Sequence, residues 1–216
     1  MFRGSSLLTR QSLKTGTDFF ALPPTSCCAI IEPLFYLQEM SVSSMVLETE
    51  RLILRRLSID DAEFVLELLN EPSFLRYIGD RGVRNLEDAA QYILNRLVTS
   101  YERNGFGLYL VELKESGIPI GISGLVKRDT LPDADIGFAF LPAYWSQGYA
   151  FESAAAVMNY ARDVLGLNRI LAITSPDNES SARLLGKIGL RYERLIKLSE
   201  DAEEVRLFTT KVEVQS

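Results

Sequence analysis

The pattern of apolar and polar positions divides the chain near residue 45. Residues 1–44 are rich in Ser, Thr and Pro and show no sustained hydrophobic period. From Glu50 onward, apolar residues recur with the spacing of strands and helices. We therefore predict one folded domain over residues 45–216, preceded by a poorly ordered leader or extension.

The strands are predicted from short runs rich in apolar and β-branched residues that end at turn residues. They cover residues 51–57, 106–113, 118–128, 134–141, 169–174, 190–198 and 204–212. The sequence KESG predicts a hairpin turn between the second and third of these strands. The segment RILAIT (169–174) is almost uniformly apolar, which is typical of a buried parallel strand.

The helices are predicted where apolar residues recur at intervals of three and four behind a capping residue. Ser58 with Asp61 resembles a capping box, and Asn85 begins a second long helix. An alanine-rich helix follows Gly148, and NESSARLLGKIG (178–189) forms the last helix. The expected buried faces are Ile59, Ala62, Leu66 and Leu69; Leu86, Ala90, Ile93, Leu97 and Tyr101; and Ala150, Ala154, Val157, Ala161 and Val164.

The order of these elements is β-α-α-β-β-β-α-β-α-β-β, which predicts an α+β fold. Because short turns join most of the strands, we expect a mixed, mostly antiparallel central sheet. A helix separates the strands 134–141 and 169–174. These two strands are therefore predicted to be parallel and joined by a right-handed crossover.

Composition excludes several kinds of chemistry. The chain contains no histidine, so a Ser-His-Asp triad, a Cys-His dyad and a His-ligated zinc site are impossible, and we expect no metal. The formal net charge of −6 argues against nucleic-acid binding and suits a cationic substrate. Cys27 and Cys28 are adjacent and form no disulfide framework, and no apolar run approaches the ~18 residues of a membrane span. We predict a cytoplasmic protein without membrane contact.

Two interpretations of residues 1–44 stay open. The basic residues Arg3, Arg10 and Lys14 precede any acid, as they do in a targeting segment. The helical period of this stretch is poor, however, which favours a dispensable extension upstream of Met45.

The sequence WSQGYA (145–150) is the clearest candidate for a binding site, because a strand passes into a helix there. The first amides of a helix lack helical partners and carry positive dipole charge, so such a turn can bind an anion. Gly148 would let the backbone approach a phosphate, and Ala150 keeps the first turn narrow. A plain strand-to-helix turn explains the same residues equally well. The candidate residues are Trp145, Ser146, Gln147, Gly148, Tyr149 and Ala150.

The preceding strand, DIGFAF (135–140), has one bulky face and one nearly bare face. The bulky face is Ile136, Phe138 and Phe140, and the bare face is Asp135, Gly137 and Ala139. A bare face is typical of close approach by a ligand, although a tightly packed helix would also require it.

Two separated motifs resemble those of the GNAT superfamily of acetyl-CoA-dependent N-acetyltransferases, most closely the branch of ribosomal-protein-alanine N-acetyltransferases. WSQGYA is similar to the family's phosphate-binding signature, with Trp145 where many members carry Gln or Arg. NESSARLLGKIGL (178–190) is similar to the second signature, and LETERLILRRL (47–57) suits this branch. The resemblance covers about residues 47–212. In the second signature Asn178, Ser181, Lys187 and Gly189 match, and Leu190 replaces a Phe.

The resemblance implies a V-shaped split between the two parallel strands, helices on both faces of the sheet, and acetyl-CoA lying across the split. The pantetheine arm would pair with backbone groups of Phe138, Ala139 and Phe140. The diphosphate would lie on the amides of residues 147–150.

Asn178 would contact the pantetheine arm from the other side of the split, with Ser181 beside it. From the residues alone, Asn178 and Ser181 also fit a helix N-cap pair, and both roles can coexist. We predict Asp135 and Asn178 as catalytic residues, with Asp135 as the general base because it begins the bare face of its strand. An exposed turn acid is the competing interpretation of Asp135.

The family's tyrosine acid is missing, since its position holds Leu185. Tyr109, Tyr149 and Ser175 are the candidate substitutes. The implied reaction is acetyl transfer from acetyl-CoA to a primary amine by direct attack in a ternary complex. The alternative is a CoA-binding module of the same fold without turnover.

The implied acceptor is a protein N-terminal α-amine or a small amine, and the protein would be a monomer or a homodimer. A helical stretch over 71–85 and the last hairpin, 197–206, would face the acceptor. The acids of that hairpin could attract a cationic amine or simply form a solvated turn. These acids are Glu200, Asp201, Glu203 and Glu204.

Overall fold

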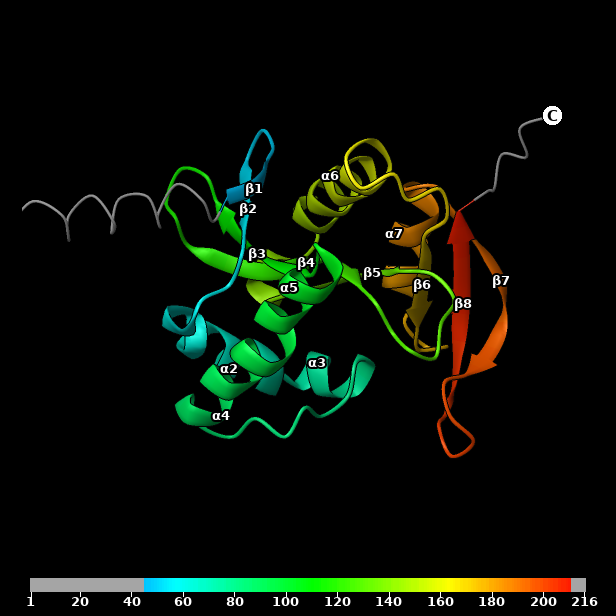
Figure 1. Ribbon diagram of the computed structural model, residues 1–216, viewed down its shortest axis with the longest axis horizontal. Coiled ribbons are helices and arrows are strands. Elements are labelled where there is room, and N and C mark those ends of the chain that lie inside the picture. Colours follow the sequence, from blue (N-terminus) through cyan, green and yellow to red (C-terminus); the bar gives the residue numbers. More distant parts are fainter. Residues whose placement is uncertain (1–44, 211–216) are drawn as a thin grey trace, which may run out of the picture. The chain divides into compact units, whose positions relative to one another are not determined.

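The structure is a computed structural model that describes residues 45–210, so the predicted leader lies outside the described residues. The described chain forms an eight-stranded sheet in the order β1-β2-β3-β4-β5-β6-β8-β7 (Figure 1). Neighbouring strands are antiparallel except β5 and β6, as predicted. The strands are β1 (Met45–Glu48), β2 (Leu52–Arg55), β3 (Leu108–Leu113), β4 (Pro119–Val126), β5 (Asp135–Phe140), β6 (Leu171–Thr174), β7 (Leu190–Lys197) and β8 (Glu204–Thr210).

The helices cover both faces of the sheet, which confirms the predicted α+β layering. In Figure 1, α6 lies on one side of the sheet and α2 to α5 lie on the other. No helix in the described part of the chain is long and apolar enough to cross a membrane. The helices are α2 (Ala62–Asn70), α3 (Pro72–Tyr77), α4 (Leu86–Tyr92), α5 (Thr99–Asn104), α6 (Tyr149–Asp163) and α7 (Glu179–Lys187), with short turns η1 (Ile59–Asp61), η2 (Ile93–Val98) and η3 (Pro142–Tyr144).

The parallel strands β5 and β6 meet only where they begin. Asp135 lies opposite Leu171, and the Leu171 amide donates to the carbonyl of Ala134 over 3.0 Å. Farther along, β5 pairs with β4 and β6 pairs with β8. The facing edges of β5 and β6 therefore part, which confirms the predicted split.

The predicted buried face of the first helix is confirmed at Leu69, which is buried, and is wrong at Ile59. Ile59 is 55% exposed, whereas Phe64, Val65 and Leu68 are buried. The capping box at Ser58 is present, but it opens a 3₁₀ turn with three residues per turn. The α-helical phase therefore begins only with α2, three residues later than the sequence suggests.

The second predicted helix contains a wider turn in its middle. The segment η2, between α4 and α5, is a π-helix. The buried residues Ala89, Ile93, Leu97 and Tyr101 are spaced by four. An α-helix would rotate such a row by about 40° at each step, and the π turn absorbs this drift. Leu86 and Val164, expected in buried faces, are exposed because they lie at or beyond helix ends.

A close approach between β3 and β4 depends on a glycine. A methyl group on Gly124 would lie 2.1 Å from the carbonyl oxygen of Gly107 and 2.8 Å from Cα of Leu108. Because both contacts are with backbone atoms, the sheet itself would have to shift.

We expect Gly124→Ala to lower the free energy of unfolding by about 1–3 kcal/mol through overpacking. Gly186→Ala is the matched control, because a methyl group there meets nothing within 4 Å and Gly186 lies within α7. Helix propensity predicts a gain of up to about 1 kcal/mol for the control. Denaturant unfolding measures both variants, and equal stabilities would contradict the packing inferred at Gly124.

Candidate active site

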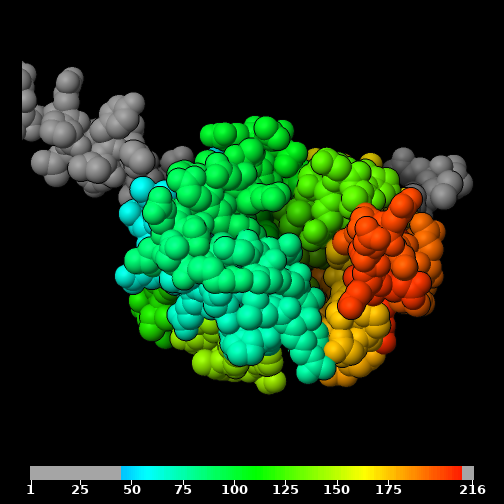
Figure 2. Space-filling model, turned by 90° about the horizontal axis from the view of Figure 1, so that it is seen from below, coloured from blue at the N-terminus to red at the C-terminus, as the bar shows by residue number. Residues whose placement is uncertain are grey.

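A cavity of about 770 Å³ lies at the split between β5 and β6. Helices on both faces of the sheet contribute to its lining, α2, α3 and α4 on one face and α6 and α7 on the other. Figure 2 shows a hollow between the α3–α4 region (teal to green) and the C-terminal hairpin (orange to red). A well-formed cavity of this size is the natural candidate for a ligand site.

The predicted site residues converge on this cavity with one exception. Gln147 is not part of the lining, and its Nε2 donates instead to the carbonyl of Ala143 over 2.8 Å. The predicted residues that line the cavity are Asp135, Phe138, Ala139, Phe140, Trp145, Ser146, Gly148, Tyr149, Ala150, Asn178 and Ser181.

The N-terminus of α6 has the features of an anion site. Its N-cap is Gly148, which has a φ of 86° and no side chain to accept from the first-turn amides. The preceding Ser146 also has a positive φ, 60°, so the backbone turns sharply just before the helix. The first amides of this fifteen-residue helix therefore carry no side-chain cap and face the cavity region.

Trp145 fixes this turn to the end of β5. Its indole Nε1 donates to the carbonyl of Phe140 over 2.7 Å, while the ring remains 47% exposed. The carbonyl of Phe140 is therefore already engaged. The backbone groups of Ala139 face β4, because they point to the same side of the strand as the Leu141 amide, which donates to the carbonyl of Ile120. Phe138 therefore presents the open backbone groups of this edge.

A carboxylate in the first turn of α6 anchors the same turn to the β1–β2 hairpin. Glu152 accepts from Thr49 Oγ1 over 2.6 Å, from the Arg51 amide over 2.9 Å and from Arg51 Nε over 2.7 Å. Burial alone would raise the pKa of Glu152, but these donors hold that pKa below its usual value. Arg51 also donates to the carbonyl of Gln147 over 3.1 Å and lies over the ring of Tyr149.

Asp135 lies at the point where β5 and β6 meet, and its side chain faces the cavity lining. The residue is only 1% exposed, so its interpretation as an exposed turn acid is wrong. Burial raises the pKa of Asp135 to about 6, although the Arg128 guanidinium, whose Nε donates over 2.9 Å, opposes that rise. A carboxyl group in this range can both hold and release a proton near neutral pH.

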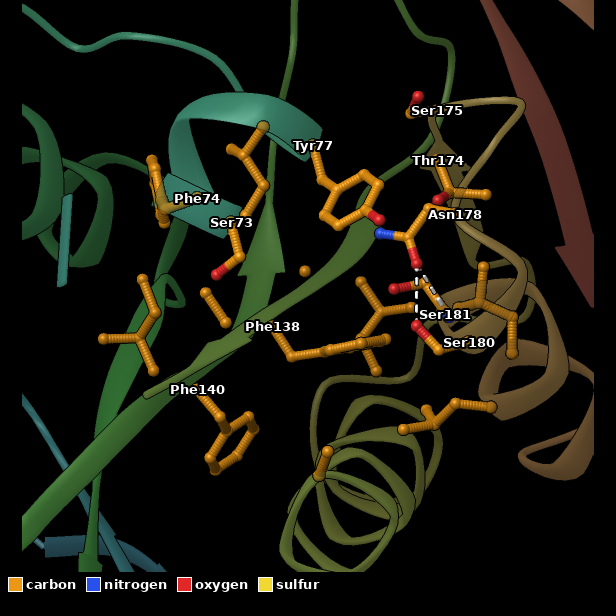
Figure 3. Close-up of a pocket in the computed structure, with 18 of the residues that line it drawn as sticks. Ser73, Phe74, Tyr77, Phe138, Phe140, Thr174, Ser175, Asn178, Ser180 and Ser181 are labelled. Carbon is orange, nitrogen blue, oxygen red and sulfur yellow. Dashed lines mark hydrogen bonds between the residues drawn. The ribbon is translucent and has the colours of Figure 1, made fainter. Parts of the chain in front are cut away.

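Asn178 caps α7, as the sequence predicted. Its Oδ1 accepts from the amide of Ser181 over 3.1 Å and from Ser180 Oγ over 2.9 Å. Within the described residues its Nδ2 has no hydrogen-bond partner, and Figure 3 shows Asn178 and Tyr77 pointing toward one another from opposite sides of the opening. The cap role leaves the amide nitrogen available to a ligand.

The candidate proton donors differ in their positions. Tyr109 lies outside the lining and stacks on Tyr101 with ring centroids 5.7 Å apart, and burial raises its pKa to about 12. It therefore belongs to the core and is a poor candidate. Tyr149 and Ser175 both line the cavity, and Leu185 contributes an apolar side chain to it.

Sequence reasoning missed several cavity residues. Arg183 and Lys187 line it from α7 and are exposed, and their spacing of four, which places them on one helix face, could have indicated a cationic pair. Arg128 gave no such signal, because its role in the lining depends on tertiary contacts. Tyr77 lies within the stretch 71–85, which the family resemblance led us to expect beside the acceptor. Among residues 45–210, no cluster of His, Cys, Asp and Glu side chains could hold a metal ion.

Comparison with known proteins identifies relatives. The family model described as "Acetyltransferase (GNAT) domain" matches residues 51–191. The chain is 33% identical over 154 residues to the Bacillus subtilis protein named "Uncharacterized N-acetyltransferase YoaA", covering 70% of this chain and 86% of that protein.

Solved structures with a similar fold are also acetyltransferases. A GNAT-family acetyltransferase from Bacillus anthracis superposes with a TM-score of 0.65 at 27% identity, over 78% of this chain and 99% of that one. Ribosomal-protein-S5-alanine acetyltransferase from Vibrio fischeri has a TM-score of 0.65 at 20% identity, over 79% and 98%. The family resemblance and the fold predicted from the sequence are confirmed.

We expect Glu152→Ala to lower the free energy of unfolding by about 1.5–3 kcal/mol, because it removes a partly buried carboxylate that accepts several hydrogen bonds. Asp163→Asn is the control, because the ion pair of Asp163 with Arg162 is exposed at the other end of α6. This variant should leave the free energy of unfolding without a measurable change. Thermal unfolding compares the two variants. A control as destabilised as Glu152→Ala would contradict the proposed anchoring of the turn.

Proposed function

This chain belongs to the GNAT acetyltransferase family, and we propose that it transfers the acetyl group of acetyl-CoA to a primary amine by direct attack in a ternary complex. Its reaction class is acyl transfer. The observation that supports the finer proposal is the single cavity that joins the uncapped N-terminus of α6 to the buried carboxyl group of Asp135. A diphosphate and a reacting amine can be held in one space of this kind.

In the proposed complex, the diphosphate of acetyl-CoA binds the first-turn amides of α6. Gly148 permits its close approach, and the exposed cations Arg183 and Lys187 compensate phosphate charge from α7. The pantetheine arm pairs with the free edge of β5 around Phe138 and meets Nδ2 of Asn178. These contacts use polar groups that the described residues leave without partners at the split.

The chemical step needs a neutral amine. Its nitrogen attacks the thioester carbonyl carbon, so a C–N bond forms and the C–S bond breaks. The proton lost by the nitrogen passes to Asp135, directly or through water. The departing thiolate takes a proton from solvent or from a cavity hydroxyl, for which Tyr149 and Ser175 are candidates. Asp135 is ionised above pH 6 and can then act as the base.

A CoA-binding module without turnover is the second candidate function. The observation that favours it is Leu185, an apolar residue at the position of the family's tyrosine acid. The two functions share cofactor binding and differ in the consequence of losing Asp135.

We expect CoA and acetyl-CoA, but not ATP, to raise the melting temperature of the full chain by several degrees. A ligand at a hundred times its Kd adds about 2.7 kcal/mol of stability. Gly148→Glu should abolish the shift, because it adds negative charge and a side chain at positive φ. Gly117→Glu is the matched control, since Gly117 also has a positive φ but lies in the β3–β4 turn outside the cavity lining.

A missing CoA shift in the wild type, or an equal loss of the shift in both glutamate variants, would contradict the proposed diphosphate site.

We expect Asp135→Asn to lower kcat/KM by roughly 10²- to 10⁴-fold at pH 7 while the thermal shift by CoA persists. As the pH falls below about 6, kcat/KM of the wild type should decrease more steeply than kcat/KM of Asp135→Asn, because only the wild type then protonates Asp135. The protonation of the amine contributes equally to both profiles, so their ratio isolates Asp135.

Asp133→Asn is the control, because Asp133 lies outside the cavity lining and should leave turnover and the pH profile unchanged. An Asp135→Asn variant with wild-type turnover would rule out the base. A wild type that binds CoA but acetylates no amine would support the module.

A further inference from the structure

We propose that the acceptor amine carries an apolar or aromatic group close to its nitrogen, and that this group binds on the α2–α4 side of the cavity. The proposal rests on the acetyl transfer proposed above and specifies its substrate class. It depends on the side chains that line that side, on their charges and on the small residues Gly137 and Ala139 of β5, which form the floor of the cavity there.

The two sides of the cavity differ in what they offer. The α6–α7 side provides helix amides and cations, which suit a phosphorylated donor. The α2–α4 side provides mainly apolar and aromatic walls. The wall residues are Leu68, Phe74, Tyr77, Tyr92, Leu108 and Val126. In Figure 3, Phe74 and Tyr77 come from α3 and lie across β5 from Asn178.

The floor of this side leaves room for a side group. A methyl group on Gly137 would lie 3.5 Å from Leu108 Cδ2 on β3 and 3.8 Å from Val126 Cγ2 on β4, which are ordinary van der Waals distances, so the glycine leaves space for a small apolar group beside these side chains. Asp135 lies on the same face of β5 and supplies the base at the end of this floor. An apolar group bound here would therefore place its amine near the carboxyl group.

The charges on this side suit one ammonium group better than several. On this side the acidic residues of the lining are Glu71 and Asp135, and the cationic residues are Arg81 and Arg128. Asp135 is already paired with Arg128. Among the described residues, only the half-buried carboxylate of Glu71 lines this side without a hydrogen bond or ion pair.

The acidic hairpin does not add to this charge. The acids suggested by the sequence lie between β7 and β8 and at the first residue of β8, and they are outside the cavity lining. From that hairpin the lining takes Leu198 and Val205, which are apolar. A polyamine would therefore place its remaining ammonium groups against apolar walls, at a desolvation cost.

The test measures kcat/KM for the full chain with acetyl-CoA, following release of the CoA thiol and the mass of the product. Phenethylamine and a peptide that begins with Phe represent the proposed class as a free amine and as a chain terminus. Ethanolamine, a peptide that begins with Gly, and spermidine are the comparisons. We expect each aromatic acceptor to exceed its matched polar or small acceptor by about tenfold or more, since a buried ring contributes that much.

A wall variant tests the location. Tyr92→Glu places a carboxylate in the apolar wall, and we expect the preference for phenethylamine over spermidine to shrink at least about tenfold. Gln91→Glu is the matched control, because Gln91 precedes Tyr92 in α4, is exposed and lies outside the lining. The thermal shift by CoA verifies that both variants are folded.

The outcomes are distinguishable. A preference for spermidine, or the same selectivity in Tyr92→Glu and Gln91→Glu, would overturn the acceptor class and leave acetyl transfer standing. A protein that is stabilised by CoA but acetylates none of these amines would overturn the proposed function and this inference together. The aromatic acceptor with the higher kcat/KM, the free amine or the peptide, shows whether the acceptor class is a small amine or a chain terminus.

Discussion

The active-site region depends on one constraint, which is that buried backbone N–H and C=O groups need partners. β5 and β6 satisfy each other only at Asp135 and Leu171, and beyond that point each strand keeps its other neighbour while their facing edges separate. An edge left open inside a folded domain is costly unless a ligand or water completes it. The parted strands therefore create both the cavity and the requirement that something polar and extended should occupy it.

Much of the fold could be predicted because its signals are local. Strand periods, the Asn178 cap and Gly148 at the start of α6 act within a few residues, and the structure has them where the sequence placed them. The order of elements was enough to predict the parallel pair. β1 was missed, because a four-residue strand whose ends are exposed shows no apolar alternation. The exposure of Ile59 and the burial of Ala89 in place of Ala90 were missed because 3₁₀ and π turns change the residues per turn without a clear sequence signature.

The site was predictable where backbone geometry carries the function and less so where tertiary contacts do. The glycine turn before α6 and the small residues on one face of β5 can be recognised in the amino-acid sequence. The burial of Asp135 is not, because it depends on the neighbouring strand and on Arg128. The engagement of the Phe140 carbonyl by Trp145 likewise depends on how segments pack, whereas α3 was expected at the acceptor side only through the family resemblance. Sequence patterns describe single elements, and a cavity is made by several.

The anchoring of α6 by the β1–β2 hairpin has a consequence for folding. Glu152 lies 103 residues from Thr49 and 101 from Arg51, so forming these contacts closes a long loop of the chain. The hairpin is also at the outer end of the sheet order, where β1 has a single neighbour. Local opening of this edge would break the contacts of Glu152 and Arg51 with the turn at Gly148, so we expect the two segments to open as one cooperative unit. A ligand bound to that turn would therefore also stabilise the β1–β2 edge of the sheet against local opening, far from the reacting atoms.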